Sequence, residues 1–315
     1  MKTLNLIFDT DLGSDCDDVM ALTYLIYAKR HLNVDIKAVT HCHSTPYGIP
    51  VIRSFFDFFD EDTPPVGRME GGAQLKDHYC KEVADAFAFH VDYDPAPAAV
   101  PVLRRALAEC NDGKCVICAV GQFTNIAALL LSKGDDISPL DGISLVRERC
   151  ERLVIMAGKL ADGEDGKRGA DWNIRWDVPS AKTLFDLSPV PIYMLPSETG
   201  KQVISGKAAV DKYGDKTPLS LAFQLFFDAR NGRSSWDPMT AVYAVEGAKD
   251  FLSESETGRI LMDGAGVTYF EPTPNGNVTV LTLKRREGMT EQECREAVAA
   301  YVDSCAESVL STCEL

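Results

Sequence analysis

The amino-acid sequence predicts an α/β fold in which a mainly parallel central sheet is flanked by helices. The main observation is that short apolar runs, typical of buried strands, alternate along the chain with segments of helical periodicity. The 315 residues contain no internal repeat, low-complexity tract or long linker. Hydrophobic residues make up 45% of them, which is ordinary for a protein with a sizeable core. We therefore expect a single domain over residues 1–315.

The alternation begins with the apolar run "TLNLIF" and continues to the run "VPIYMLP". Expected strands cover residues 3–8, 34–42, 63–69, 114–120, 151–158 and 190–196. Expected helices cover residues 17–30, 49–60, 100–110, 123–134 and 179–188. Such βαβ units make a Rossmann-like sheet, whose sites lie beyond the carboxyl ends of the strands. The segments after Phe8, Val120 and Ile155 should therefore share one edge of the sheet.

The C-terminal part of the chain has a different pattern. Residues 266–283 read as two strands joined at Asn275–Gly276, a dipeptide that favours tight hairpin turns. Thr290 and Glu293 then form a capping box at the start of an amphipathic helix that extends to residue 310. We expect a β-hairpin and a helix appended to the central sheet.

Composition excludes several classes of partner. Lys and Arg number 32 against 47 Asp and Glu, a net charge of −15, and no basic stripe could follow a phosphate backbone. Nucleic acid is therefore not an expected partner. No stretch approaches the ~20 apolar residues needed to cross a bilayer, and the N-terminus lacks a signal-peptide pattern. We expect no membrane partner and a cytoplasmic location.

The ten cysteines are spread over the chain without a secretory signal. Cys115 and Cys118 form a C-x-x-C pair within an expected buried strand, and no second Cys or His pair has the spacing of a zinc site. We therefore expect buried free thiols.

An acidic cluster directly follows the first expected strand. Its members, within ten positions, are Asp9, Asp11, Asp15, Asp17 and Asp18. Carboxylates this close repel one another, and a hard divalent cation such as Ca²⁺ or Mg²⁺ would relieve the repulsion. The start of the following helix also favours negative charge through its dipole. The cluster predicts a metal site.

Other interpretations of the cluster are an acidic helix-capping turn, an EF-hand loop and an aspartyl-nucleophile phosphatase. The EF-hand is disfavoured because a strand precedes the cluster and Met20 stands where its glutamate is needed. The phosphatase remains open, with Lys159 as its lysine, although it leaves the pair Asp17–Asp18 unexplained.

The segment "FDTDLGSDCDDVMAL" resembles the N-terminal signature D-x-D-P-G-x-D-D-x-x-A of the inosine-uridine-preferring nucleoside hydrolases. Here Leu12 replaces the proline, and the interval after Gly13 is two residues longer, as in a divergent branch of that family. "AVGQFTNIAALL", the segment "MAGK…DWNIRWDVPSA" and "SWDPMTAVYAV" resemble three further family motifs in the same order. The four together are far more specific than any one of them.

The resemblance implies a single Ca²⁺ in a deep pocket. Its ligands would be Asp11, Asp18, the backbone carbonyl of Val120 or a close neighbour, and Asp237. Asp11 would be the catalytic residue, the general base that deprotonates a metal-activated water. Asp237 also reads as a helix N-cap before Pro238, and the two roles are compatible.

The same resemblance implies the substrate contacts. Asp17 and Asn173 would bind the ribose hydroxyls, and Asp171 would support them. His43, in the segment "VTHCHSTPYG", is a further substrate-binding candidate. Trp236 stands where the family commonly has a histidine that assists the departing base. Trp172 and Trp176 flank Asn173. We expect both to pack in the core; the alternative is that one of them lines the pocket.

The implied activity is Ca²⁺-dependent hydrolysis of the N-glycosidic bond of a small-molecule ribonucleoside, in nucleoside salvage, by a homo-oligomer (dimer or tetramer). One alternative is an N-ribosyl hydrolase for another ribosyl substrate, with Arg175 or Lys159 facing a phosphate. Another is a non-catalytic Ca²⁺-dependent protein that binds ribose or nucleosides. The preferred base stays open because the family's histidine is missing.

Overall fold

The structure, a computed structural model, describes residues 3–88, 96–110, 113–163, 166–227 and 229–313. Its strands are β1 (Leu4–Thr10), β2 (Val34–His41), β3 (Val66–Arg68), β4 (Cys115–Ala119), β5 (Cys150–Met156), β6 (Ile192–Leu195), β7 (Ile204–Ser205), β8 (Arg233–Ser234), β9 (Leu252–Glu254), β10 (Gly258–Met262), β11 (Thr268–Pro272) and β12 (Val278–Leu283). Its helices are α1 (Asp17–His31), α2 (Gly48–Phe58), α3 (Cys80–Phe87), α4 (Ala99–Ala108), α5 (Thr124–Leu131), α6 (Gly142–Arg149), α7 (Trp172–Arg175), α8 (Val178–Leu187), α9 (Ser197–Gly200), α10 (Lys207–Tyr213), α11 (Pro218–Leu225), the 3₁₀ helix η1 (Ala229–Asn231), α12 (Trp236–Glu246) and α13 (Glu291–Leu310).

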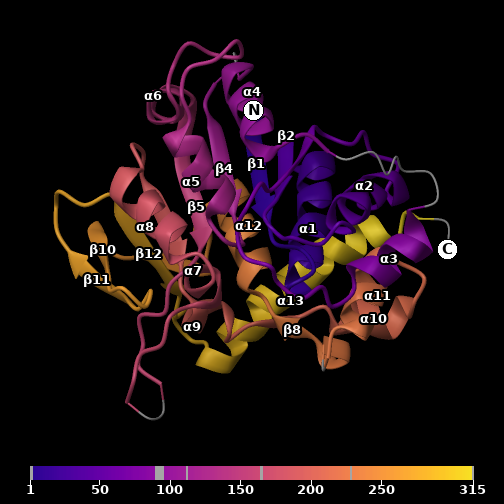
Figure 1. Cartoon of the computed structure of the whole chain (residues 1–315). Coiled ribbons are helices and arrows are strands. Elements are labelled where there is room, and N and C mark those ends of the chain that lie inside the picture. Colours follow the sequence, from indigo (N-terminus) through magenta and orange to yellow (C-terminus); the bar gives the residue numbers. More distant parts are fainter. Residues whose placement is uncertain (1–2, 89–95, 111–112, 164–165, 228, 314–315) are drawn as a thin grey trace.

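The central sheet contains its strands in the order β3-β2-β1-β4-β5-β6-β12-β10-β11 (Figure 1). Neighbours from β3 to β12 are parallel, whereas β10 is antiparallel to both β12 and β11. The mainly parallel α/β fold predicted from the sequence is thus confirmed. Strands β2 and β3 follow β1 on one side of it, and the chain then returns to place β4, β5 and β6 on the other side. This reversal makes a topological switch point between β1 and β4. Ligands bind beyond the carboxyl ends of strands at such a point.

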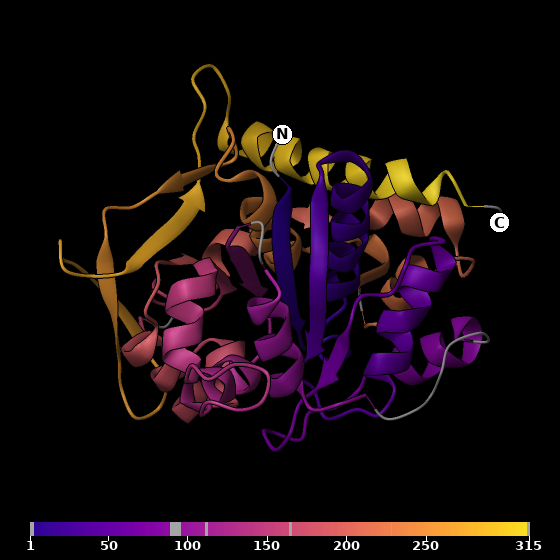
Figure 2. The ribbon, with the colours of Figure 1, turned by 90° about the horizontal axis from the view of Figure 1, so that it is seen from above.

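Helices cover both faces of the sheet, and β1 contributes to a core on each side (Figure 2). Leu6 and Phe8 pack with α1, α12 and α13, whereas Ile7 faces the opposite layer of α4, α5 and α8. All three side chains are fully buried. A strand covered on both faces reads as a continuous apolar run, as β1 does. The same alternation turns Asp9 toward α5 and Thr10 toward α1.

The predicted hairpin at Asn275–Gly276 is wrong in its pairing. Strands β11 and β12, which flank this turn, are not neighbours, because β10 lies between them and pairs with both. The hairpin of this region is β10–β11. The turn instead carries the chain past the end of β10: a Cβ on Gly276 would lie 1.9 Å from the carbonyl oxygen of Gly258. This close backbone approach lets β12 pair in parallel with β6.

Other local predictions have mixed outcomes. The capping box of Thr290 and Glu293 at α13 is confirmed. The free-thiol prediction is wrong for Cys110 and Cys115, which form a disulfide between the end of the α4 segment and β4. The remaining eight cysteines are free, and all but Cys313 are buried.

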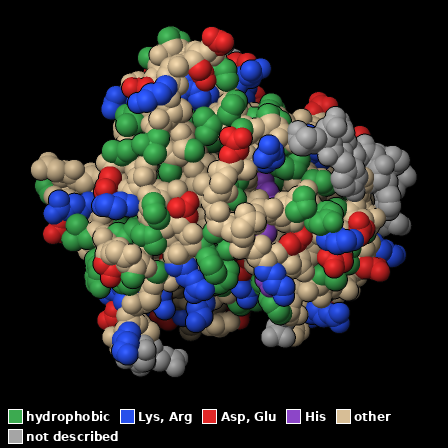
Figure 3. Space-filling model, in the orientation of Figure 1, with side chains coloured by type: hydrophobic (Ala, Val, Ile, Leu, Met, Phe, Trp, Pro, Cys, Tyr) green, Lys and Arg blue, Asp and Glu red, His purple; other side chains and the backbone are tan. Residues whose placement is uncertain are grey.

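The described part of the chain contains no helix that is both long and apolar enough to cross a membrane. On the face shown in Figure 3, basic and acidic side chains are interspersed and form no continuous basic stripe. This surface agrees with the charge distribution inferred from the sequence.

Candidate active site

The loop between β1 and α1 contacts the segment that follows β4, so it lies at the switch point. Asp11 follows β1 and is 3% exposed, and its Oδ2 accepts hydrogen bonds from Ser14 Oγ and from Gln122 Nε2, the latter at 2.7 Å. Gln122 follows β4. A Cβ on Gly121 would lie 2.7 Å from the backbone nitrogen of Asp11, so the strand ends meet backbone to backbone. Both bonds fall on Oδ2, which leaves Oδ1 of Asp11 for a ligand or a water.

Contacts from outside the loop fix its course. Gly13 has φ of +113°, a conformation that favours glycine, and its N–H donates to Tyr79 Oη at 3.0 Å. Tyr79 Oη in turn donates to the carbonyl of Asp15 at 2.8 Å. The N–H of His78 donates to the carbonyl of Gly13 at 3.0 Å. The loop is therefore held by the segment that leads into α3.

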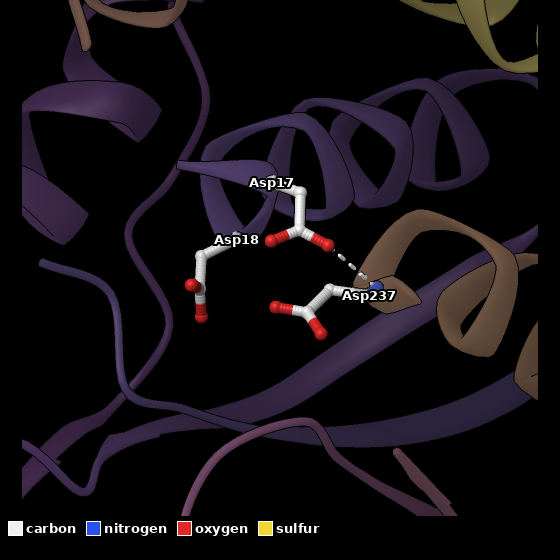
Figure 4. A group of neighbouring side chains, drawn as sticks. All are labelled: Asp17, Asp18 and Asp237. Carbon is white, nitrogen blue, oxygen red and sulfur yellow. Dashed lines mark hydrogen bonds between the residues drawn. The ribbon is translucent and has the colours of Figure 1, made fainter. Parts of the chain in front are cut away.

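Three carboxylates from two helix starts converge next to this loop (Figure 4). Asp17 and Asp18 begin α1 and Asp237 lies in the first turn of α12, and one oxygen of each lies within 4.8 Å of the others. The N–H of Asp237 donates to Asp17 Oδ2 at 3.0 Å. Thr10 donates to Asp18 Oδ1, whereas Asp18 Oδ2 is buried without a partner among the described residues. We call Asp17, Asp18 and Asp237 the carboxylate triad.

The triad is electrostatically unfavourable without a counter-ion. Burial raises the pKa of Asp17, Asp18 and Asp237 well above the usual value for aspartate, and repulsion by neighbouring carboxylates, Asp11 and Asp15 included, adds to this effect. Burial also raises the pKa of Asp11 to about 6. A hard cation with oxygen ligands would offset both effects and satisfy the orphaned Oδ2 of Asp18. The residues present therefore fit a divalent metal ion.

The predicted site residues Asn173 and Asp171 lie beside the ends of β4 and β5. Asn173 Nδ2 donates to the carbonyls of Val120 (2.6 Å) and Met156 (3.1 Å), which joins the ends of β4 and β5. Asp171 is the N-cap of α7 and accepts from the N–H of Asn173 at 3.0 Å and from Ser197 Oγ at 2.5 Å. Burial raises the pKa of Asp171 to about 6. Asp171 thus holds Asn173 in place.

A cavity of about 440 Å³ contains these groups. The predicted site residues that line it are Asp11, Asp17, Asp18, Val120, Asp171, Asn173, Trp236 and Asp237. Asp9 is not among the lining residues: its Oδ1 accepts from Asn125 Nδ2 at 2.8 Å on the α5 side of the sheet. The cavity therefore unites predicted site residues from four separate segments of the chain.

His43 is the predicted site residue that the structure places elsewhere. It lines a second cavity of about 430 Å³ together with His41, Ser44 and Thr45. Its Nδ1 accepts a hydrogen bond from the N–H of Thr45 at 2.9 Å, which holds the ring on that side. Among the described histidines, only His78 lines the first cavity. His90 lies outside the described residues.

Sequence reasoning gave no individual role to eight further lining residues, which we call the rim of the first cavity, although Asp15 belongs to the predicted acidic cluster. These are Ser14, Asp15, His78, Met156, Ser197, Phe226, Phe227 and Arg233. Most come from segments without a resembling motif. The rings of His78, Phe226 and Phe227 lie 4.7–5.3 Å apart, which gives the rim an aromatic character.

Trp172 and Trp176 are more exposed than predicted. Trp172 and Trp176 are 45% and 40% exposed, so the expected core packing is wrong; Trp172 lines the cavity. Arg175 lies over both rings, at 4.7 and 5.2 Å from their centres. Trp236 Nε1 donates to the carbonyl of Ser197 at 2.7 Å.

The N-cap interpretation of Asp237 is also wrong. Helix α12 begins at Trp236 and its N-cap is Ser235, so Asp237 is the second helical residue. Its carboxylate does not cap the helix but faces the other two carboxylates of the triad, those of Asp17 and Asp18 (Figure 4).

The fold and the site together define an α/β protein with a buried carboxylate cluster, able to hold a metal ion, at the switch point of a Rossmann-like sheet. The model of the family described as inosine-uridine preferring nucleoside hydrolase matches residues 6–306. The chain belongs to this family of hydrolases, which act on N-glycosyl compounds. A comparison with curated proteins finds no match.

Solved structures share the fold over almost the whole chain. The inosine-uridine preferring nucleoside hydrolase of Bacillus anthracis is 18% identical with a TM-score of 0.69, and the match covers 97% of this chain and 100% of that one. The type III effector XopQ complexed with adenosine diphosphate ribose is 17% identical, with a TM-score of 0.68 and coverage of 98% and 93%. An inosine-guanosine nucleoside hydrolase is 18% identical, with a TM-score of 0.66 and coverage of 95% and 98%.

Proposed function

We propose that the protein hydrolyses the N-glycosidic bond of a ribonucleoside in a Ca²⁺-dependent reaction, releasing ribose and the base. The observation that carries this proposal is the carboxylate triad beside Asp11 in a cavity of about 440 Å³. Cavities of about 300–1,000 Å³ are typical of small-molecule sites. Membership of the nucleoside hydrolase family supports this substrate class.

Asp11, Asp18, Asp237 and the carbonyl of Val120 would hold the Ca²⁺. When bound there, the ion would lower the pKa of a water and orient the ribose hydroxyls. Asp11 has its Oδ2 engaged by Ser14 and Gln122, so Oδ1 is the atom that accepts the proton of the attacking water. These two contacts also orient the carboxylate.

The remaining polar residues bind and orient the sugar. Asp17 has one oxygen engaged by the N–H of Asp237, and its second oxygen can accept a ribose hydroxyl. Asn173 commits its Nδ2 to two backbone carbonyls, so its Oδ1 is the atom that remains for the sugar. Both oxygens of Asp171 are engaged by Asn173 and Ser197, which makes it a supporting residue.

The alternative of a phosphate-bearing ribosyl substrate was to be recognised by a cationic residue at the pocket. Neither Arg175 nor Lys159 lines the cavity, and the cation that does line it, Arg233, is paired with Asp15 through its Nε and Nη2. We therefore keep the nucleoside as the proposed substrate. The proposed setting is nucleoside salvage in the cytoplasm by a homo-oligomer, a dimer or tetramer as the family resemblance implies.

A reducing-sugar assay over a panel of ribonucleosides tests the proposal. With Ca²⁺ we expect ribose release from at least one riboside, and we expect a chelator to abolish it because the triad then lacks its counter-ion. Calorimetry with Ca²⁺ alone checks metal binding independently. Ca²⁺ and nucleoside binding without any ribose release would show a binding protein and contradict the proposal.

Leaving-group chemistry gives a second expected result. Breaking the bond leaves negative charge on the base, and Trp236 cannot protonate it because indole does not titrate and its N–H is bonded to Ser197. The pKa of His78 is lowered by partial burial and by Lys76, which reduces the protonated fraction that could donate a proton at neutral pH. We expect 4-nitrophenyl riboside to turn over at least ~100-fold faster than inosine, the usual effect of a missing acid.

Equal turnover of the two substrates would contradict this expectation and show that an acid serves the leaving group. Tyr243 is not that acid, because it lies outside the cavity and its hydroxyl donates to Glu254 at 2.7 Å. His78→Gln would then identify or exclude the histidine on the rim.

A further inference from the structure

The side chain of Arg233 is held in place on the rim of the active-site cavity by several contacts. Its Nε and Nη2 donate to Asp15 at 2.9 and 2.5 Å, a two-point ion pair. Its guanidinium carbon lies 5.1 Å from the ring centres of both Phe226 and Trp236. A guanidinium held by a carboxylate and two rings is fixed in orientation.

This arrangement leaves one end of the guanidinium available. A guanidinium carries five N–H donors, and the pair with Asp15 engages Nε and Nη2. No hydrogen bond connects Nη1 with any residue in the described ranges. Arg233 is also the one Lys or Arg among the described residues that line the cavity. It is thus the cation of an otherwise acidic site.

The cavity has an oxygen-rich side and an aromatic side. The triad, Asp11 and Asn173 supply the oxygen-rich side that suits a cation and sugar hydroxyls. The rim supplies rings on which a flat heterocycle can stack: Phe226, Phe227, Trp236 and His78. Arg233 lies between two of these rings, at the side of the cavity where a departing base would be bound.

We propose that Arg233 contacts the leaving group and stabilises the anion formed when the glycosidic bond breaks, and that Asp15 positions Arg233. This inference rests on the proposed function. The oxygen of water bonds to the anomeric carbon, and the electron pair of the C–N bond stays on the base nitrogen. Asp11 takes one water proton. Arg233 stays charged, pairs with the base anion and delivers no proton, because a guanidinium keeps its proton in proteins; solvent then protonates the base.

The location of Asp15 explains why this loop is longer than the family signature. Asp15 lies within the interval after Gly13 that is extended by two residues. Its carbonyl is held by Tyr79 Oη at 2.8 Å, so both its backbone and its side chain are fixed. The extension therefore supplies the carboxylate that orients Arg233, while Trp236 replaces the histidine of the family.

The test compares Arg233→Gln with the parent on two substrates. For inosine we expect kcat/KM to fall about 100-fold, the usual effect of losing one donor to developing negative charge. For 4-nitrophenyl riboside we expect a loss of less than about 5-fold, because a good leaving group needs little stabilisation. Asp15→Asn should change the substrate ratio in the same direction, by about 10-fold, and Asp15→Glu should restore part of it.

Arg168→Gln is the matched control. Arg168 also pairs with a carboxylate, Asp162 at 2.9 Å, and lies 4.9 Å from the ring of Tyr269, but it does not line the cavity. We expect its substrate ratio to equal that of the parent. Ca²⁺ affinity, measured by calorimetry, should stay within a few-fold in Arg233→Gln, which shows that the triad is intact.

Two results separate the possible failures. Equal losses on both substrates in Arg233→Gln, with Ca²⁺ affinity retained, would overturn the role of Arg233 and leave the hydrolase proposal standing. Absence of turnover of either substrate by the parent protein would overturn the proposed function, and this inference with it.

Discussion

Asp11→Asn is expected to lower kcat by about 10²–10⁴-fold, the range for loss of a general base. The change is nearly isosteric: the amide oxygen can take the position of Oδ2 and accept from Ser14 and Gln122 as the carboxylate does, which places the amide nitrogen in the position of Oδ1. It removes the group that takes the proton of water. Circular dichroism, calorimetry with Ca²⁺ and nucleoside turnover together measure fold, metal affinity and activity.

Ser14→Ala is the control for Asp11→Asn. It removes one hydrogen bond to Asp11 Oδ2 and keeps the carboxylate, so its effect on kcat should stay below about 10-fold, as expected for one net hydrogen bond. Asp11→Asn activity within a few-fold of the parent would show that a different group activates the water.

The second large effect is expected for Asp18→Ala, which should reduce Ca²⁺ affinity by well over 100-fold. Loss of groups that merely orient metal ligands costs about 10–100-fold, and Asp18 contributes a buried oxygen that has no other partner among the described residues. Without Ca²⁺ the variant should unfold at a higher temperature than the parent, because a repelling buried carboxylate is gone.

Added Ca²⁺ should therefore raise the melting temperature of the parent but not that of Asp18→Ala. A ligand at 100 times its Kd stabilises the folded state by about 2.7 kcal/mol. Asp15→Asn, a neighbour in the same loop that is outside the triad, is expected to keep the Ca²⁺ affinity of the parent within a few-fold. Unchanged Ca²⁺ affinity in Asp18→Ala would exclude Asp18 from the metal site.

Much of the fold was predictable because its strands are buried on both faces. The apolar runs that became β1, β4 and β5 have the continuous pattern of central parallel strands. The error at Asn275–Gly276 has a different origin. A turn dipeptide predicts a reversal of the chain, but which strand becomes the partner is decided by tertiary packing, here by the insertion of β10.

The predictable part of the site is the part whose chemistry is visible in one short segment. Paired carboxylates at the end of a strand indicate a metal site, and Asp17 and Asp18 do form one group with Asp237. Phe226 and Arg233 gave no such signal. Arg233 contacts Asp15, Phe226 and Trp236, and no local sequence pattern records those contacts.

The dependence of the Asp11 loop on Tyr79 has a consequence for local unfolding. This loop contains no proline, and tertiary hydrogen bonds with His78 and Tyr79 hold it. A proline restrains the chain even when its surroundings open, but these bonds act only while the start of α3 stays packed. We therefore expect the loop and α3 to open as one cooperative unit. Substitutions that destabilise the packing of α3 should therefore lower the metal affinity of the site, even though they lie away from its carboxylates.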